Sequence, residues 1–538
     1  MTNKLFYGDN LDVLREHIAS ESVDLVYLDP PFNSNANYNI LFKSKTGDGS
    51  DAQIEAFEDT WHWNDRAEDA FDQVARSGNT KAFDLLNAMR GFLGENDMMA
   101  YLAMMAIRLI ELHRVLKPTG SLYLHCDPTA SHYLKLLLDG VFGADKFRSE
   151  ISWRRQSAHN DAAQGRQQYG NVRDIIFFYT KGSKWNWNWL YTDYDEEYLR
   201  KFSRHVEPES GRRFFLGDIT APGGADPAKR NPHYQFLGVT RYWRFSQERM
   251  QRMHDEGRIV QSAPGKVPRQ KRYLDEMPGV ALQNDWTDIT SLHGVTGERL
   301  GYPTQKPLAL LERIIAASSN EGDVVLDPFC GCGTAVHAAQ KLGRQWIGID
   351  ITHLAISLIE KRLKDAFPGI AFEVHGTPKD LASARDLAER DKYQFQWWAV
   401  SMVEALPFGG KKKGADGGID GIIYFKPDGK RTEKALVSVK GGGNVSVNMI
   451  RDLHSAMERE KAPIGVFITA AMPTRPMETE AAAVGRFESE ATGRTYPRLQ
   501  IITLAELFQG KKPDIPFVDQ ASVKRAKREE TGKQERLI

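Results

Sequence analysis

The feature that most constrains the fold is a short apolar run that ends in an acid and two prolines. Residues 22–28 predict a buried strand, because they are nearly all apolar and rich in β-formers. Asp29-Pro30-Pro31-Phe32 follows directly. Because proline cannot donate to a ladder or lead a strand into a helix, the strand has to stop at Asp29 and open into a stiff loop. In open α/β sheets, ligands bind at this carboxyl end of the strands.

The loop predicts chemistry on an exocyclic amine. The Asp29 carboxylate and the Pro30 carbonyl are adjacent acceptors, which suit the two hydrogens of an adenine or cytosine amino group. Phe32 can stack on the base once the base has left the duplex, a contact that contributes roughly 1–3 kcal/mol in single-strand binders. The alternative interpretation is an ordinary strand-to-turn Asp-Pro-Pro without a catalytic role.

The composition is that of a globular protein with several domains. The chain has 538 residues, of which 41% are hydrophobic and 26% are charged. Lys plus Arg and Asp plus Glu both total 71, so a surface for DNA has to come from local patches. Three cysteines give no disulfide framework, and we expect neither a signal peptide nor a membrane span. We therefore expect a cytoplasmic protein.

The first 150 residues predict alternating strands and helices. Strands are expected at 4–9, 22–28 and 121–125, and helices at 11–18, 98–116 and 134–142. This alternation favours a parallel sheet with crossover helices. We interpret the polar segment 33–95 as a long lid or DNA-facing insertion. Beyond residue 150, basic and aromatic residues interleave around a strand at 174–179 and suit phosphate contacts, although each cluster is equally consistent with a solvated charged face.

A second strand-to-loop motif lies near residue 327. A strand at 323–326 runs into Asp327-Pro328-Phe329-Cys330-Gly331-Cys332-Gly333-Thr334, a helix follows to residue 342, and a strand at 345–349 ends in Asp350. This βαβ unit with a glycine turn and a later acid is typical of nucleoside binding, in which the acid takes ribose hydroxyls. The turn carries fewer glycines than a dinucleotide site.

Asp29-Pro30-Pro31-Phe32, followed far downstream by the motif at 327–334, resembles the β-class amino-directed DNA methyltransferases. That class includes adenine-N6 enzymes and the modification subunits of type III restriction systems. The resemblance implies an α/β, Rossmann-like methyltransferase sheet with an inserted target-recognition domain, and S-adenosylmethionine as methyl donor. The implied catalytic residues are Asp29, Pro30, Pro31 and Phe32. The implied cofactor residues are Asp9, Thr304, Lys306, Asp327, Phe329, Gly331, Gly333 and Asp350.

Family roles follow from the same resemblance. Asp9 is implied to lie near the cofactor adenine, Thr304-Gln305-Lys306-Pro307 beside the methionine moiety, and residues 177–179 beside the flipped base. Asp29 and the Pro30 carbonyl would accept the amine hydrogens while the nitrogen attacks the sulfonium methyl, a step that requires no metal. Adenine is favoured, because cytosine-N4 members more often carry Ser in place of Asp29. Cytosine-C5 chemistry is disfavoured, because no Pro-Cys occurs.

Residues 395–485 resemble the Mrr-type restriction endonucleases of the α/β PD-(D/E)xK fold. Asp420 matches the metal-binding acid and Lys440 the lysine, while Glu404 is a candidate for an additional helix acid. Ser438 stands where the family has Glu, Asp or Gln, and serine lacks the charge to share a metal. The resemblance therefore implies Mg²⁺ at Asp420 only if this domain cleaves DNA, and a non-cleaving DNA-binding remnant is the alternative.

The expected domains are two methyltransferase halves around a recognition region, then a nuclease-like domain and a charged, disordered tail. Their boundaries are 1–150, 151–295, 296–375, 390–510 and 511–538. The expected function is adenine-N6 methylation of duplex DNA in a restriction-modification system, with a homodimer and a restriction-system partner left open. The alternatives are a single-chain restriction enzyme that mainly cleaves, a cytosine-N4 methyltransferase, and a DNA-binding module without catalysis.

Overall fold

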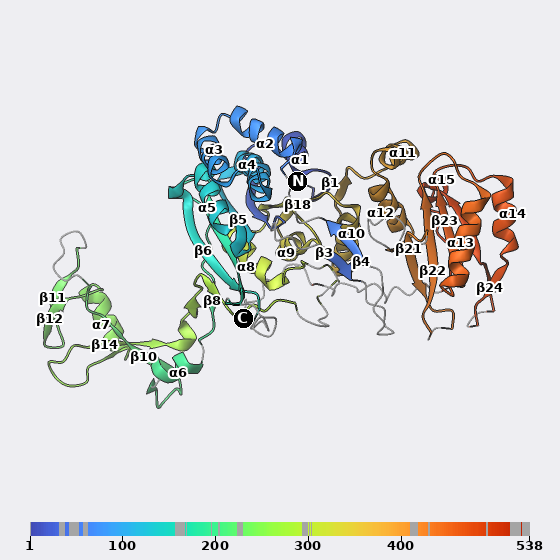
Figure 1. The fold of residues 1–538 in the computed structure, drawn as a ribbon. Coiled ribbons are helices and arrows are strands. Elements are labelled where there is room, and N and C mark those ends of the chain that lie inside the picture. Colours follow the sequence, from blue (N-terminus) through green and yellow to red (C-terminus); the bar gives the residue numbers. More distant parts are fainter. Residues whose placement is uncertain are drawn as a thin grey trace. The chain divides into compact units, whose positions relative to one another are not determined.

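The computed structural model divides the chain into two compact units (Figure 1). One unit combines residues 1–188 with 284–534, and the other comprises 189–283 with 535–538. The structure describes residues 2–31, 38–41, 53–57, 63–156, 167, 169–194, 196–202, 205–222, 230–292, 298, 300, 302, 304–408, 418–428, 431–490, 493–516 and 529. Among these residues, no helix is long and apolar enough to cross a membrane.

Within the described residues, the first unit contains a nine-stranded mixed sheet. Its spatial order is β16 (Asp285–Trp286), β6 (Phe147–Arg154), β7 (Arg173–Thr180), β5 (Leu116–Cys126), β2 (Val23–Leu28), β17 (Val324–Asp327), β18 (Gln345–Asp350), β1 (Lys4–Tyr7) and β19 (Glu373–His375). Neighbouring strands are parallel except where β7 runs antiparallel to both β5 and β6. The predicted α/β sheet is thereby confirmed, and its wholly parallel character is corrected at β7.

The sheet explains how two distant motifs meet. Strands β2 and β17 are parallel neighbours, with Leu25 opposite Val325 and Val26 opposite Leu326. Because the carboxyl ends of parallel neighbours reach the same edge, the loops that begin at Asp29 and Asp327 emerge side by side. That edge is the usual ligand-binding edge of an open α/β sheet.

Helices cover both faces of this sheet. The core on one face joins even-numbered residues of β2, such as Val26 and Leu28, to helices α1, α4 and α5, as strand alternation requires. On the other face, Ser318 Oγ of α8 lies 2.7 Å from the Tyr123 hydroxyl of β5. The helices are α1 (Asn10–His17), α4 (Asp97–Val115), α5 (Pro128–Phe142), α8 (Leu308–Ser318), α9 (Thr334–Lys341) and α10 (His353–Ala366), with a 3-10 turn, η1 (Ala144–Lys146).

The prediction of a lid over residues 33–95 is wrong for its second half. Helices α2 (Asp65–Arg76) and α3 (Thr80–Leu93) occupy that half, and Phe71, Val74 and Leu86 are buried in the same core as α4. Their charged residues lie on the opposite helical faces, which makes the segment look polar in sequence. Upstream, β3 (Tyr38–Leu41) and β4 (Gln53–Phe57) form an antiparallel pair, and residues 42–52 and 58–62 lie outside the described residues.

The second unit is a small insertion built from short strands. It begins at residue 189, whereas we predicted a recognition region from 151, because β6 and β7 continue the main sheet. Ile219, Trp243 and Met250 centre its apolar core. Its elements are β8 (Tyr191–Thr192), α6 (Glu196–Phe202), β9 (His205–Val206), β10 (Arg213–Asp218), β11 (His233–Phe236), β12 (Val239–Tyr242), α7 (Gln247–Asp255), β13 (Ile259–Val260), β14 (Arg269–Tyr273), η3 (Leu274–Glu276) and β15 (Val280–Ala281).

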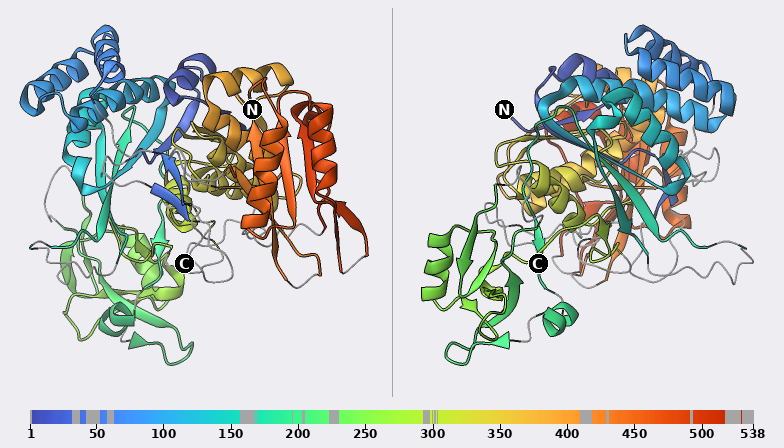
Figure 2. Two further views of the ribbon diagram at one scale, coloured as in Figure 1. Left: turned by 45° about the vertical axis from the view of Figure 1, so that its right-hand side comes forward. Right: turned by 90° about the vertical axis from the view of Figure 1, so that its left-hand side faces the viewer.

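A second sheet with its helices, coloured orange to red in Figure 2, follows the methylase-like core within the first unit. In the described residues its spatial order is β20 (Leu406–Pro407), β21 (Gly421–Phe425), β22 (Glu433–Lys440), β23 (Ile464–Thr469) and β26 (Leu499–Thr503). The other elements are α11 (Leu381–Arg390), α12 (Lys392–Met402), α13 (Val447–Arg459), α14 (Arg475–Ala483), β24 (Arg486–Glu488), β25 (Thr495–Pro497) and α15 (Leu504–Phe508).

The predicted disordered tail contains several ordered contacts, those of Lys512 and Glu529 among them. Glu529 donates its backbone N–H to the Ala366 carbonyl at 2.9 Å, and its carboxylate lies 3.4 Å from Lys341 Nζ. The prediction of disorder therefore fails at Glu529. Residues 511–516 are also described, and the rest of the tail lies outside the described residues.

Candidate functional site

Asp29 lies directly beyond the end of β2, with Pro30 buried next to it. Its Oδ2 accepts a hydrogen bond from Lys306 Nζ, and both side chains are largely buried. Its Oδ1 is also buried and has no hydrogen-bond partner among the described residues. A buried acceptor without a partner is costly, which makes this atom a candidate for binding a donor from a substrate. Phe32, the predicted stacking residue, lies outside the described residues.

Lys306 reaches Asp29 from a segment 277 residues away in the chain. The preceding Gln305 is fixed by its own amide, which donates to the Glu298 carbonyl and accepts from the Leu300 N–H, both at 2.8 Å. The segment therefore holds Lys306 firmly at the sheet edge, and Thr304 lies half-buried beside it. The sequence predicts Lys306 near the cofactor, and the structure adds its ion pair with Asp29, the acid predicted to bind the amine.

The glycine turn after β17 is held open by hydrogen bonds from both ends. Asp327 Oδ1 accepts from the Phe329 N–H at 3.0 Å, and Asp350 Oδ2 accepts from the Gly331 N–H at 2.9 Å. Gly331 and Gly333 adopt φ angles of +53° and +76°, which side chains disfavour. A Cβ at Gly333 would lie 2.8 Å from Ile359 Cγ1. The turn thus needs glycine for conformation and for space.

Asp9 is fixed by an arginine that the sequence did not single out. Arg108 of α4, almost wholly buried, donates through Nη2 to both Asp9 carboxylate oxygens at 2.9 and 3.0 Å. Its Nε donates to Asn10 Oδ1 at 2.6 Å, and Asn10 Nδ2 donates to the Pro328 carbonyl at 2.9 Å. This chain of bonds ties the end of β1 to the glycine turn.

The carboxylates of the site interact electrostatically. Burial raises the pKa of Asp327 well above its ordinary value, and the charges of Asp29 and Asp350 raise it further. Burial also raises the pKa of Asp350 to about 6. The pKa shifts thus show that Asp29, Asp327 and Asp350 lie close enough to influence one another at this edge of the sheet.

A buried hydrogen-bonded chain of side chains lies at the same edge of the sheet. The Tyr27 hydroxyl is 3.0 Å from His125 Nδ1, and His125 Nε2 is 3.2 Å from Asp174 Oδ2. Arg155 Nη1 lies 3.4 Å from Asp174 Oδ1. Burial alone would raise the pKa of Asp174, but the hydrogen bond and charge of His125 outweigh it and hold that pKa below its ordinary value. Tyr27, His125 and Asp174 stand on three separate strands, and Arg155 directly follows β6, so sequence spacing gives no sign of the chain.

The predicted role of residues 177–179 beside a flipped base is wrong. Phe177 and Tyr179 are buried in the main core, and the Tyr179 hydroxyl donates to Asp139 Oδ1 at 2.6 Å. Phe178 stacks on Tyr123 with ring centroids 4.5 Å apart. Because β7 runs antiparallel to β5, its first residues, not 177–179, reach the edge where Asp29 lies.

The nuclease-like residues form a weaker constellation. Asp420 precedes β21, and its Oδ2 accepts from the Val439 N–H of β22 at 2.6 Å. Ser438 and Lys440 lie on one face of β22, and Ser438 is buried. Glu404 follows α12 in a left-handed conformation with φ +56° and pairs with Lys512, so the prediction that it is a helix acid is wrong. The described residues contain no cluster of His, Cys, Asp or Glu fit for a metal.

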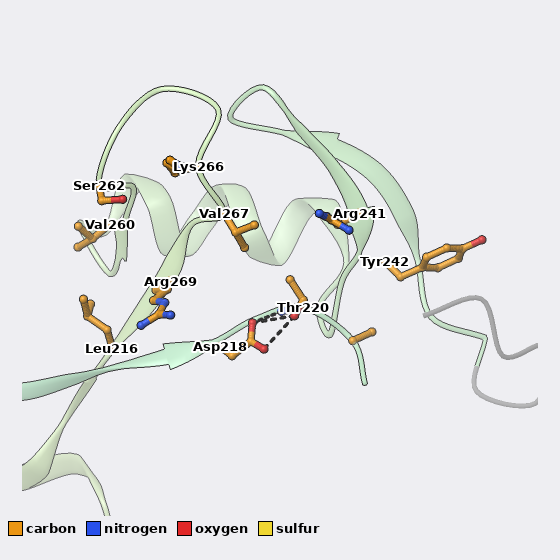
Figure 3. A pocket seen from close by; sticks show the side chains of 11 residues that line it. Leu216, Asp218, Thr220, Arg241, Tyr242, Val260, Ser262, Lys266, Val267 and Arg269 are labelled. Carbon is orange, nitrogen blue, oxygen red and sulfur yellow. Dashed lines mark hydrogen bonds between the residues drawn. The ribbon is translucent and has the colours of Figure 1, made fainter. Parts of the chain in front are cut away.

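The insertion carries a basic pocket, drawn in Figure 3. Arg241, Lys266 and Arg269 contribute its cations. Asp218 also lines it and accepts from the Thr220 hydroxyl at 2.8 and 2.9 Å, as the dashed lines in Figure 3 show. Exposed arginines and lysines arranged in this way suit contacts to phosphates.

Comparison with known proteins identifies relatives for both parts of the chain. Residues 23–361 match the family described as DNA methylase, and residues 401–509 match a family described as NACHT-associated inactive Restriction Endonuclease 1. The Type II methyltransferase M.EcaI of Enterobacter cloacae is 34% identical over 49% of this chain and 57% of its own length.

Two further relatives cover more of this chain. The Type III restriction-modification enzyme StyLTI Mod subunit of Salmonella typhimurium is 25% identical over 64% of this chain and 50% of its own length. The DNA adenine methyltransferase YhdJ of Escherichia coli is 27% identical over 67% of this chain and 82% of its own length. The chain thus spans only about half the length of M.EcaI and of the StyLTI subunit.

Proposed function

Because the chain belongs to the DNA methylase family, we propose that it transfers a methyl group from S-adenosylmethionine to the N6 amino group of a flipped adenine in duplex DNA. The observation that carries this proposal is the buried Oδ1 of Asp29, which has no hydrogen-bond partner in the described part of the chain and lies beside Pro30 at the same sheet edge as the glycine turn. An acid that keeps one acceptor free at a ligand-binding edge is what recognition of an amine requires.

Asp29 and Pro30 orient the amine in this mechanism. Asp29 Oδ1 and the Pro30 carbonyl each accept a hydrogen bond from one N–H of the amine. These two bonds turn the nitrogen lone pair toward the cofactor side of the crevice. Lys306 occupies the other carboxylate oxygen and so fixes which oxygen faces the base. Preset acceptors of this kind lower the barrier without reorganising during the reaction.

The residues of the turn fit S-adenosylmethionine. When bound, the cofactor supplies an activated methyl group on a sulfonium. Gly331 and Gly333 leave space for its close approach, Asp350 would hold the ribose hydroxyls, and Asp9, braced by Arg108, would bind the adenine. Thr304 and Lys306 would flank the methionine part.

Adenine is the preferred target over cytosine. Asp29 matches the acid that adenine enzymes of this class share, and the relative YhdJ is named a DNA adenine methyltransferase. Family membership by itself is compatible with both N6 and N4 chemistry. The nucleoside that is methylated therefore distinguishes the two.

We propose duplex DNA as the substrate and the insertion as the part that reads it. The pocket with Arg241, Lys266 and Arg269 supports contacts to the phosphates. The likeness to a type III Mod subunit supports a role in restriction-modification with a partner subunit. The unpaired, buried cysteines Cys126, Cys330 and Cys332 fit a reducing cytoplasm.

Label transfer tests the proposal. Incubation with tritiated S-adenosylmethionine should place methyl label in duplex DNA, and Asp29→Ala should stop the transfer while the cofactor still binds in calorimetry. Undiminished transfer by Asp29→Ala would reject the amine-site assignment. Absence of cofactor binding by the unmodified chain would favour a DNA-binding module without catalysis.

A further inference from the structure

Two neighbouring tryptophans of α12, at the start of the nuclease-like domain, face different parts of the molecule. Trp397 is 7% exposed and clusters with Tyr302 and Cys332 of the methylase core. Trp398 is 4% exposed and belongs to the core of the nuclease-like domain. One helix therefore joins the two cores through adjacent residues of the same type.

The partners of Trp397 are parts of the cofactor turn. Cys332 lies between Gly331 and Gly333 in sequence. The Tyr302 ring lies against Gly331, because a Cβ at Gly331 would lie 3.3 Å from Tyr302 Cε1. Tyr302 also leads into the segment that carries Lys306. Trp397 thus packs on both chain segments that shape the proposed cofactor site.

A second residue of α12 reaches the neighbourhood of the ribose acid. Gln394 Oε1 accepts the His353 N–H at 3.1 Å, at the first residue of α10. The preceding Thr352 donates its N–H and its hydroxyl to Asp350 Oδ1, both at 2.9 Å. The His353 ring stacks on Tyr7, which leads into Gly8 and Asp9, with ring centroids 3.6 Å apart.

We propose that α12 is a structural part of the cofactor site, and that Trp397 and Gln394 are positioning residues for S-adenosylmethionine. Trp397 braces Tyr302 and Cys332 behind the glycine turn, and Gln394 fixes the start of α10 beside Asp350. The nuclease-like domain then serves methyl transfer by supporting the cofactor pocket. This inference rests on the proposed function, since it assigns residues that support the same site.

The proposal has a thermodynamic consequence. If packing of α12 favours the binding geometry of the turn, bound cofactor must favour the packing of α12 to the same extent, because coupling between two sites is reciprocal. Occupancy of the methylase site is thereby communicated to the nuclease-like domain. The contact is local and apolar, so a change of one side chain suffices to test it.

The test compares Trp397→Ala with the matched variant Trp398→Ala in the full chain. S-adenosylmethionine affinity is measured by calorimetry well below the unfolding temperature, together with KM and kcat for methyl transfer. We expect Trp397→Ala to raise Kd and KM for the cofactor at least tenfold, with kcat at saturation within twofold. We expect Trp398→Ala to lower Tm at least as much and to leave Kd within twofold.

Two milder variants keep the test informative if Trp397→Ala unfolds. Trp397→Phe should retain most of the affinity, and Gln394→Ala, which changes a half-buried polar side chain, should raise Kd about threefold. Wild-type Kd in Trp397→Ala or in Gln394→Ala, or equal weakening in Trp398→Ala, would overturn the proposal. Failure of the unmodified chain to bind the cofactor would instead reject the proposed function and this inference with it.

Discussion

Asp29 and Asp420 are acids at strand ends in two α/β sheets of the same chain, and they are held in opposite ways. Asp29 pairs with Lys306 through one oxygen, and its other oxygen is buried without a partner among the described residues. Asp420 Oδ2 accepts a hydrogen bond from the Val439 N–H at 2.6 Å, and Ser438 stands where a second acid is expected beside Asp420. The first site keeps an acceptor ready for a substrate, whereas the second ties its acid to the backbone.

This difference shows that a domain can keep its fold without keeping the arrangement of side chains that a functional site needs. The nuclease-like sheet has a well-formed apolar core, yet its Asp420 accepts from the backbone of β22, and the described residues contain no cluster of acids fit for a metal. At the edge of the methylase sheet, Asp29 Oδ1 is buried without a hydrogen-bond partner in the described part of the chain, and such an atom lowers stability until a ligand binds to it. The predictions that follow test this contrast in order of decreasing effect.

Asp29→Asn should have the largest effect. The asparagine amide keeps the shape of the side chain, but it is neutral and has a donor NH₂ in place of one acceptor oxygen. Methyl transfer should therefore fall by about 10²–10³-fold or more. Single-turnover label transfer measures the loss, and calorimetry should show cofactor affinity within threefold of wild type. A variant that retains a tenth of the activity would contradict the assigned role.

Lys306→Met should lower kcat by roughly 10–100-fold, because it leaves the buried Asp29 carboxylate without its cation. Lys306→Arg should recover part of this loss if charge is what matters. Steady-state kinetics at saturating DNA and cofactor separate the effect on kcat from one on KM. An increase in KM for the cofactor with an unchanged kcat would mean that Lys306 serves the methionine part instead of Asp29.

Gly333→Val should weaken cofactor binding by at least about tenfold, since its φ of +76° and the nearby Ile359 leave no room for a branched side chain. Gly369→Val is the matched control, with φ +84° and no atom within 4 Å of its Cβ position. Both variants should lose stability in thermal unfolding. Equal cofactor affinity in the two variants would count against the turn as the binding site.

Cofactor binding should weaken as the pH falls through about 6. The pKa of Asp350 is raised to about 6 by burial, so its ionised form, which accepts ribose hydroxyls, is lost below that pH. The effect on folding stability runs the other way. Above about pH 6 the buried, ionised Asp350 lowers the free energy of unfolding, and this loss disappears as the pH falls from 6 to 3.8, the pKa of the group in the unfolded chain. Calorimetry from pH 7.5 to 5 measures the change, and Asp350→Asn should flatten it.

We expect the smallest change in activity from Asp420→Ala and Lys440→Ala. Because Ser438 stands in place of a second acid, we expect no metal-dependent cleavage for either substitution to abolish, and methyl transfer should stay within twofold of wild type. Nicking of supercoiled plasmid with Mg²⁺ or Mn²⁺, with and without cofactor, is the measurement. Metal-dependent cleavage that both substitutions abolish would show that the nuclease-like site is active and would remove the contrast.

Much of the fold was predictable because its signals are local. Prolines after Asp29 and glycines after Asp327 mark strand ends, and the apolar runs before them mark the strands. Helix α2 was missed although Phe71 and Val74 fit a helical stripe, because charged residues dominate the segment. The direction of β7 decides that residues 177–179 face the core, and a single strand gives no sign of its direction.

The site was predictable only where it is built from motifs. The pairing of Lys306 with Asp29 joins residues 277 positions apart, and the sequence indicated each without indicating their contact. His125 and Asp174 look like ordinary core residues until the sheet order places their strands together. Arg108 belongs to no motif of the sequence, and its function as a brace for Asp9 follows from its burial and its hydrogen bonds in the structure.

The most direct test of the account is mass spectrometry of nucleosides from duplex DNA methylated in vitro by the purified chain. The account predicts N6-methyladenine with the unmodified chain and none above background with Asp29→Ala. N4-methylcytosine in place of N6-methyladenine, or equal N6-methyladenine from both proteins, would contradict it.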